Sequence, residues 1–127
     1  MKAIIFVAAA VLLMACSSAE NANSISQSEL LTRINNNAAV LILDVRSPEE
    51  YRSGHVPGAI NIPFGDHERK LALISPAKND EIIVYCESGY RAAKVETYLI
   101  DQGYSEVRHL EGDMKGWRKA NYKKVGG

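Results

Sequence analysis

The chain has 127 residues, which is enough for one domain with a hydrophobic core of ordinary size. Its 15 basic and 15 acidic residues balance, so there is no excess of positive charge with which to hold a nucleic acid. Hydrophobic residues make up 46% of the sequence, an ordinary proportion for a globular protein. The composition therefore favours a small globular domain and argues against a nucleic-acid partner.

Residues 1–15 are predicted to be a secretory leader and not part of the fold. Lys2 gives a positive start, and the apolar run that follows is too short to cross a membrane comfortably. The leader has two candidate ends. In the one that we favour, the residues before Cys16 resemble a bacterial lipobox, and Cys16 becomes the lipid-bearing first residue of a periplasmic, membrane-anchored protein. In the other, an ordinary signal peptidase cuts after residue 19 and removes Cys16. The protein is expected to be exported in both cases.

The rest of the chain is predicted to form a single domain. Residues 16–24 are expected to be a flexible tether, because this short stretch becomes polar before the first helix signal. The folded domain is predicted over 25–122, and residues 123–127 are expected to be a tail. The sequence contains no internal repeat, which favours one fold over a repeat array.

Helices and strands alternate along the predicted domain. Ser26, with Glu29 three residues later, and Ser47, with a proline next to it, both have the form of helix N-caps. Gly103 is expected to end a helix in the left-handed conformation. In chain order we predict a helix over 26–35, a strand over 40–45, a helix over 47–54, a strand over 59–62, a helix over 66–74, a strand over 81–85, a helix over 91–102, a strand over 107–110 and a helix over 113–121.

This alternation predicts an α/β fold of three layers, with a mostly parallel central sheet and helices on both of its faces. The helix over 66–74 is expected to direct Leu71 and Ile74 inward, and Trp117 is expected in the core. Ligands of such sheets bind outside the carboxyl ends of the strands. Cys86 directly follows a predicted strand and therefore falls at this edge.

Cys86 is the strongest candidate for a catalytic residue. It lies on a short turn that contains Gly89, where backbone N–H groups and the positive end of a helix dipole favour an anion, and so favour thiolate over thiol. The thiolate is the nucleophilic form of cysteine. Once Cys16 has been lipidated or removed, Cys86 is also the remaining free thiol of an exported chain, which suggests a reactive group. A buried and inert cysteine at a strand end is the alternative.

Four motifs occur in order between residues 25 and 120. They are Leu43-Asp44-Val45-Arg46 with Glu49-Glu50-Tyr51, then Gly54-His55-Val56-Pro57-Gly58-Ala59 with Asn61-Ile62-Pro63, then the loop from Cys86 to Arg91, and finally Leu110-Glu111-Gly112 with Trp117. In this order they resemble the motifs of the single-domain rhodaneses, a sulfurtransferase family. The resemblance covers nearly all of the predicted domain and implies a rhodanese-like fold.

The resemblance also implies a reaction. Cys86 would attack the outer sulfur of a donor such as thiosulfate and become a persulfide, and a thiol or cyanide acceptor would then remove that sulfur. Backbone N–H groups of the loop would hold the negative charge of the persulfide. The substrate-binding residues implied are Glu87, Ser88, Gly89, Tyr90 and Arg91.

Loop length separates sulfur transfer from phosphate chemistry within this resemblance. Related phosphatases and arsenate reductases have one more residue between the cysteine and the arginine, whereas four residues separate Cys86 from Arg91 here. The tighter loop favours a sulfurtransferase. No cofactor is implied. No metal site is expected either, because His67 and His109 are scattered and, with one cysteine in the mature chain, no metal-ligand spacing exists.

Three loop residues have more specific expectations. Arg91 is expected either to hold a donor's sulfonate and stabilise the thiolate, or to pair with a neighbouring carboxylate. Glu87 stands where many thiosulfate-using relatives carry arginine, so its carboxylate is expected to repel a dianionic donor, unless it points to solvent and is screened. Tyr90 is expected to line the entrance and restrict substrate size.

Asp44 falls on the rim of the predicted site and has a supporting role in either of two forms. It is expected either to orient Arg91 or the loop, or to form a structural ion pair with Arg46 or a cap. Arg46 and Glu50 are expected to pair with each other. His55 is expected to have a buried hydrogen-bonding role and not a catalytic one.

Two functions of other kinds remain open at this stage. One is a persulfide carrier whose donor is a partner protein, which the acidic Glu87 makes attractive. The other is a binding module that has kept the fold without catalysis, against which the intact loop of Cys86 argues. The oligomeric state is not predicted.

Overall fold

The structure is a computed structural model that describes residues 23–127. The predicted leader over 1–15, its alternative end at residue 19, and Cys16 lie outside the described residues. Within residues 23–127, no helix combines the length and the apolar character that crossing a membrane requires.

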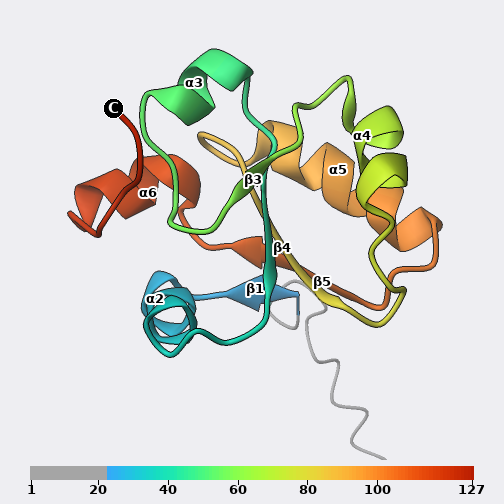
Figure 1. The fold of residues 1–127 in the computed structure, drawn as a ribbon, viewed down its shortest axis with the longest axis horizontal. Coiled ribbons are helices and arrows are strands. Elements are labelled where there is room, and N and C mark those ends of the chain that lie inside the picture. The colour runs from blue at the N-terminus through green and yellow to red at the C-terminus, as the bar shows by residue number, and fades with distance from the viewer. Residues whose placement is uncertain (1–22) are drawn as a thin grey trace, which may run out of the picture.

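Between residues 23 and 127, five parallel strands form one sheet at the centre of the domain (Figure 1). Across the sheet they follow the order β1, β5, β4, β2, β3. β4 lies in the middle and bonds with a neighbour along each edge, as its nearly continuous apolar sequence suggests. The bounds are Ser24–Ile25 for β1, Leu41–Asp44 for β2, Ile60–Asn61 for β3, Glu81–Tyr85 for β4 and Glu106–Leu110 for β5.

Helices cover both faces of the sheet, which confirms the predicted three-layer α/β architecture (Figure 1). α4 and α5 pack on one face, through Leu71 and Leu99. α2 and α6 pack on the other, through Leu30 and Trp117. The bounds are Gln27–Asn35 for α2, Pro48–Arg52 for α3, His67–Ile74 for α4, Tyr90–Asp101 for α5 and Asp113–Lys119 for α6.

Two predicted N-caps are confirmed. The Ser26 hydroxyl accepts a hydrogen bond from the Glu29 amide at 3.1 Å. At the start of α3 the capping box is complete, because the Ser47 hydroxyl accepts from the Glu50 amide and the Glu50 carboxylate accepts from the Ser47 amide. α3 is therefore held at its first turn by Glu50, a residue that also faces the candidate site.

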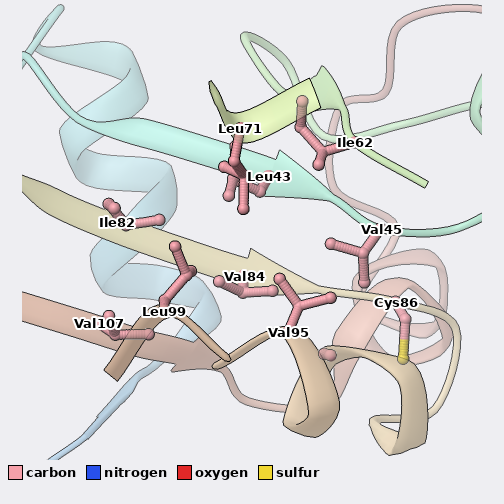
Figure 2. Close-up of a cluster of buried hydrophobic side chains, with 11 residues drawn as sticks. Leu43, Val45, Ile62, Leu71, Ile82, Val84, Cys86, Val95, Leu99 and Val107 are labelled. Carbon is pink, nitrogen blue, oxygen red and sulfur yellow. The ribbon is translucent and has the colours of Figure 1, made fainter. Parts of the chain in front are cut away.

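Side chains of the strands alternate between two separate hydrophobic cores, one on each face of the sheet. Ile82, Val84 and Cys86 belong to the core under α5, whereas Ile83 and Tyr85 belong to the core under α6. Figure 2 shows the core under α5, with Ile82 near one end and Cys86 at the other. The period of β4 thus continues through Cys86 and directs its side chain to the α5 face.

The tether prediction is wrong at its last residue. Ser24 and Ile25 form β1, a two-residue strand that pairs in parallel with β5. The Ser24 carbonyl accepts hydrogen bonds from the Arg108 guanidinium, at 2.7 Å from Nη2, and the Ile25 side chain is buried. The remainder of the predicted tether, up to residue 22, lies outside the described residues. A strand this short carries no periodicity that a sequence pattern can show.

Two further details differ from prediction. Residues 123–127 do not form a free tail, since Val125 and His55 exchange backbone hydrogen bonds of 2.9 Å and the Gly127 amide donates to the Arg52 carbonyl. The domain therefore extends beyond residue 122. Ile74 is 38% exposed instead of inward, because α4 ends there and turns away from the sheet, while Leu71 is buried as predicted.

Candidate active site

Cys86 lies on the turn that joins the end of β4 to the start of α5, as predicted. Its side chain is 1% exposed, and its Sγ accepts a hydrogen bond from the Gly89 amide at 3.0 Å. Gly89 has a φ of 114°, in the region that favours glycine, and this conformation turns its N–H toward the sulfur. In the described chain one loop amide contacts Sγ, where the sequence predicted several. The loop therefore supplies one directed donor to the sulfur.

The backbone of the loop is docked on the first turn of α6. The Met114 amide donates to the Cys86 carbonyl at 2.9 Å, and the Lys115 amide donates to the Glu87 carbonyl at 3.1 Å. In the other direction, the Cys86 amide donates to the Asp113 carboxylate at 3.0 Å. These contacts join a turn and a helix that are far apart in the sequence. They satisfy amides at the start of α6 that have no partner within the helix.

Arg91 forms a bidentate ion pair with Glu50. The two N–O distances are 2.7 and 3.0 Å. Hydrogen bonds from Arg91 lower the pKa of Glu50 to about 2, and those same bonds raise the pKa of Arg91, with a smaller contribution from Cys86. Arg91 thus pairs with a neighbouring carboxylate, which was one of its two predicted roles. Its guanidinium is also close enough to interact electrostatically with Cys86.

Asp44 and Arg46 form a buried ion pair, and the predicted pairing of Arg46 with Glu50 is wrong. Asp44 Oδ2 lies 2.7 Å from Arg46 Nη2 and also accepts a hydrogen bond of 2.8 Å from the Tyr85 hydroxyl. Burial and the adjacent Asp44 raise the pKa of Tyr85. Glu50 is directed to Arg91 because the start of α3 faces the start of α5. Of the roles predicted for Asp44, the structure shows the ion pair with Arg46.

Glu87 is not a free carboxylate at the mouth of the site. It forms an ion pair with Arg118 of α6, and its other oxygen lies 3.7 Å from Arg46 Nη1. Two guanidinium groups thus compensate its charge, which removes much of the predicted repulsion of an anionic donor. Glu87 is thus neither beside the donor nor free in solvent, because it pairs across to Arg118, 31 positions away in the sequence.

Ser88 and Tyr90 form the exposed outer side of the loop. Tyr90 is 72% exposed, and its ring lies 5.4 Å from the Lys94 ammonium. The role of Tyr90 in lining the entrance and restricting substrate size stays a prediction.

One group beneath the loop was missed by sequence reasoning, which treated His109 as scattered. His109 Nδ1 lies 2.6 Å from the Glu96 carboxylate of α5, and His109 Nε2 lies 3.0 Å from the Asp113 carboxylate. Burial disfavours charge on the ring, but the hydrogen bonds to Asp113 and Glu96 outweigh it and raise the pKa of His109 to about 10. The register of β5 against β4 places His109 next to Val84, two residues before Cys86, and so brings its ring beneath the loop.

Trp117 lies in the core as predicted, and His55 has a hydrogen-bonding role but is only half-buried. His55 is half-buried, its Nδ1 lies 2.8 Å from the Tyr51 carbonyl, and its ring stacks on the Tyr51 ring. Trp117 is fully buried and donates to the Lys123 carbonyl. Residues 23–127 hold no group of three or more His, Cys, Asp and Glu side chains placed to bind a metal ion.

The sequence of this chain is similar to those of known sulfurtransferases and other proteins with a rhodanese-like domain. A model of the rhodanese-like domain family matches residues 26–120. Thiosulfate sulfurtransferase PspE of Escherichia coli K12 is 40% identical over 70 residues, which cover 55% of this chain and 67% of PspE. A protein named Sulfurtransferase from Allochromatium vinosum is 31% identical over 97 residues, covering 76% of this chain and 89% of its own length.

A longer relative and two solved structures extend the comparison. YrkF of Bacillus subtilis 168, named as a candidate sulfur carrier protein, is 34% identical over 79% of this chain, and the chain spans 55% of YrkF. The crystal structure of a rhodanese-like domain protein from Staphylococcus aureus is 36% identical with a TM-score of 0.66, covering 75% of this chain and 90% of its own. A human single-domain sulfurtransferase, TSTD1, is 28% identical with a TM-score of 0.68, covering 76% and 96%.

Proposed function

The chain belongs to the family of proteins with a rhodanese-like domain, and from this membership we infer that it transfers sulfur through a persulfide on Cys86. The position of Cys86 carries the proposal. The residue follows the central strand, and its sulfur accepts a hydrogen bond from the Gly89 amide on the turn before α5. A cysteine so placed has a directed N–H donor for negative charge on sulfur.

The reaction has two displacements on sulfur. The Cys86 thiolate attacks the outer sulfur of thiosulfate, the S–S bond of the donor breaks, and sulfite leaves with the bonding electron pair. An acceptor thiolate then attacks the terminal sulfur of the persulfide, and Cys86 leaves as a thiolate. No redox partner or metal enters either step. The Gly89 amide is the donor available to the charged sulfur.

Burial of Cys86 sets a condition on this reaction. At 1% exposure, the side chain is reached from solvent only when the outer side of the loop moves. Ser88 and Tyr90 form that exposed side, so we place the approach of the donor there. The same burial protects a persulfide from water and from oxidants between the two displacements.

A persulfide carrier that receives its sulfur from a partner protein is the second candidate. The exposed rim formed by Ser88 and Tyr90 favours it, because a protein donor would contact this rim while Cys86 remains buried behind it. The sulfur chemistry at Cys86 is the same in both functions. They differ in how fast small donors load the cysteine.

The experiment is to incubate the full chain with thiosulfate, and separately with glutathione persulfide, and then to weigh the tryptic peptide over 79–91, which contains Cys86 and not Cys16. We expect the mass of one added sulfur atom, lost again with formation of thiocyanate when cyanide is added. Cys86→Ser should gain none. Fast loading by thiosulfate favours the sulfurtransferase, and loading by the persulfide alone favours the carrier. If neither donor adds sulfur to the folded protein, the chain is a binding module.

We also propose export and lipid anchoring, on the pattern of the first 16 residues. Expression in a bacterium supplied with radiolabelled fatty acid should label the protein and place it in the membrane fraction. Cys16→Ala should abolish the label. An unlabelled but exported wild-type protein would instead support cleavage after residue 19.

A further inference from the structure

The group beneath the loop of Cys86 has no part in the two displacements just described. It consists of Glu96, His109 and Asp113, from α5, β5 and α6. Asp113 is 4% exposed, and no other acidic residue of the described chain, apart from the paired Asp44, is buried to this degree. A buried carboxylate is costly unless hydrogen bonds compensate its charge. Asp113 is therefore not a surface charge that serves solubility, and its burial indicates a structural role.

Hydrogen bonds connect this group directly to the reactive residue. Asp113 divides its two oxygens, with Oδ1 accepting from the Cys86 amide at 3.0 Å and Oδ2 lying 3.0 Å from His109 Nε2. The other ring nitrogen of His109 lies 2.6 Å from Glu96. The ring is thus held from both sides, and it fixes the orientation of the carboxylate that holds Cys86.

The Asp113 backbone places the carboxylate at the loop. Its φ of 55° is in the left-handed region, which costs free energy for a residue other than glycine but is tolerated by Asp. The loop lies immediately above the group, because a Cβ added to Gly89 would come within 3.3 Å of Asp113 Oδ2 and 3.8 Å of the His109 ring. The residue whose amide contacts Sγ therefore rests on the same carboxylate that holds the Cys86 amide.

We propose that Asp113, oriented by His109 and Glu96, is a positioning residue that holds Cys86 and the Gly89 amide in the arrangement required for sulfur transfer. The link to sulfur transfer rests on the proposed function, whereas the positioning of Cys86 by Asp113 does not. Asp113 fixes the Cys86 peptide from below, and Gly89 is packed against the other oxygen. Without the carboxylate, the Cys86 amide loses its partner, and only the bonds from the Met114 and Lys115 amides hold the turn on α6, so the sulfur can shift away from the Gly89 amide.

Two substitutions of Asp113 separate positioning from simple folding. Asp113→Gly suits the left-handed backbone and removes the carboxylate, whereas Asp113→Asn keeps an oxygen that can accept from the Cys86 amide. Asn121→Gly is the matched control, because Asn121 has a φ of 57° at the exposed far end of α6. Circular dichroism and urea unfolding establish that each full-length variant is folded.

The first readout is the rate at which iodoacetamide alkylates Cys86, measured on the tryptic peptide over 79–91, because it needs no sulfur donor. The second is sulfur transfer, as kcat and KM. For Asp113→Gly we expect the alkylation rate to change by about tenfold or more and kcat to fall by about tenfold to a hundredfold with little change in KM. Asp113→Asn should recover most of kcat. Asn121→Gly should match the wild type.

The proposal is overturned if folded Asp113→Gly keeps the wild-type alkylation rate and kcat, or if Asp113→Asn is as impaired as Asp113→Gly. If Asp113→Gly does not fold, His109→Asn decides, since it leaves the bond from the Cys86 amide and removes the group that orients Asp113. An unchanged alkylation rate in His109→Asn then overturns the proposal. Should the wild type accept no sulfur while alkylation still depends on Asp113, the proposed function fails and the positioning role stands.

Discussion

Glu87, the residue next to Cys86, shows how pairing decides the effect of a charge. Its carboxylate pairs with Arg118 and lies near Arg46, which is itself paired with the buried Asp44, so two positive and two negative charges balance here. Removing the charge of Glu87 would leave both guanidinium groups without this partner. The local potential would then become more attractive to a dianion such as thiosulfate.

We predict that Glu87→Gln raises kcat/KM for thiosulfate by about threefold to tenfold, mainly through a lower KM, because the freed Arg118 attracts the donor. The gain should shrink in high salt. Glu106→Gln is the control, since it removes the same charge at the opposite end of the sheet, where β5 begins. An unchanged kcat/KM in Glu87→Gln would show that Glu87 does not restrict the donor, and a lower one would show that Glu87 is needed to hold the loop.

At the scale of elements, the unit formed by β5 and α6 supports the loop. β5 places His109 beside Val84 of β4, and α6 begins directly after with Asp113. The helix binds the loop with backbone amides as well as with a carboxylate. α5 completes the arrangement by contributing Glu96 on the other side of the ring. The turn of Cys86 is thus positioned by two helices and a neighbouring strand, and not by its own residues alone.

The charge of His109 should make stability depend on pH. Its pKa is raised from 6.5 to about 10 in the folded protein, so its stabilising contribution is complete below about pH 6.5 and is lost as the pH rises toward 10. The titratable groups that face the ring are Glu96 from α5 and Asp113 from α6. We predict that the free energy of unfolding declines over this window more steeply in the wild type than in His109→Gln.

Urea unfolding of both proteins at a series of pH values measures this difference. Tyrosine and lysine side chains also titrate near the upper limit, and comparison of the two proteins removes their common contribution. His67→Gln serves as a second control, because His67 lies on α4 at the other side of the core. A difference between wild type and His109→Gln that stays constant with pH would contradict a charged His109.

At the scale of the whole molecule, one sheet separates two cores and is shared by both. Leu99 of α5 and Leu30 of α2 are fully buried on opposite faces. β4 contributes alternate side chains to each core, so loss of packing on one face also weakens the strand that supports the other. The domain should therefore unfold as one unit.

We predict that Leu99→Ala and Leu30→Ala each lower the free energy of unfolding by about 2–5 kcal/mol, and that each variant still unfolds in a single transition. Leu73→Ala, at a side chain that is 74% exposed, should change it by less than about 0.5 kcal/mol. Fluorescence of Trp117 on the α6 face and circular dichroism over both faces should report the same midpoint. Separate midpoints in either core variant would show that the two cores unfold independently.

Local patterns were sufficient for most of the fold and for the position of Cys86. Apolar runs marked β2 and β4, the caps at Ser26 and Ser47 marked two helix starts, and a cysteine directly after β4 fell at the carboxyl edge of a parallel sheet. Each of these inferences depends on residues within a few positions of one another. Backbone hydrogen bonding and side-chain period respond to such neighbours, which is why the sequence alone was enough.

Only the tertiary structure decided which charged groups meet. Arg91 pairs with Glu50, 41 positions away, and Cys86 bonds to Asp113, 27 positions away. The joining of residues 123–127 to His55 and of β1 to β5 are contacts of the same kind. Ion pairs form between whichever side chains strand order, register and helix packing bring within about 4 Å. No local pattern encodes that arrangement, so the residues that surround Cys86 are determined by the tertiary structure.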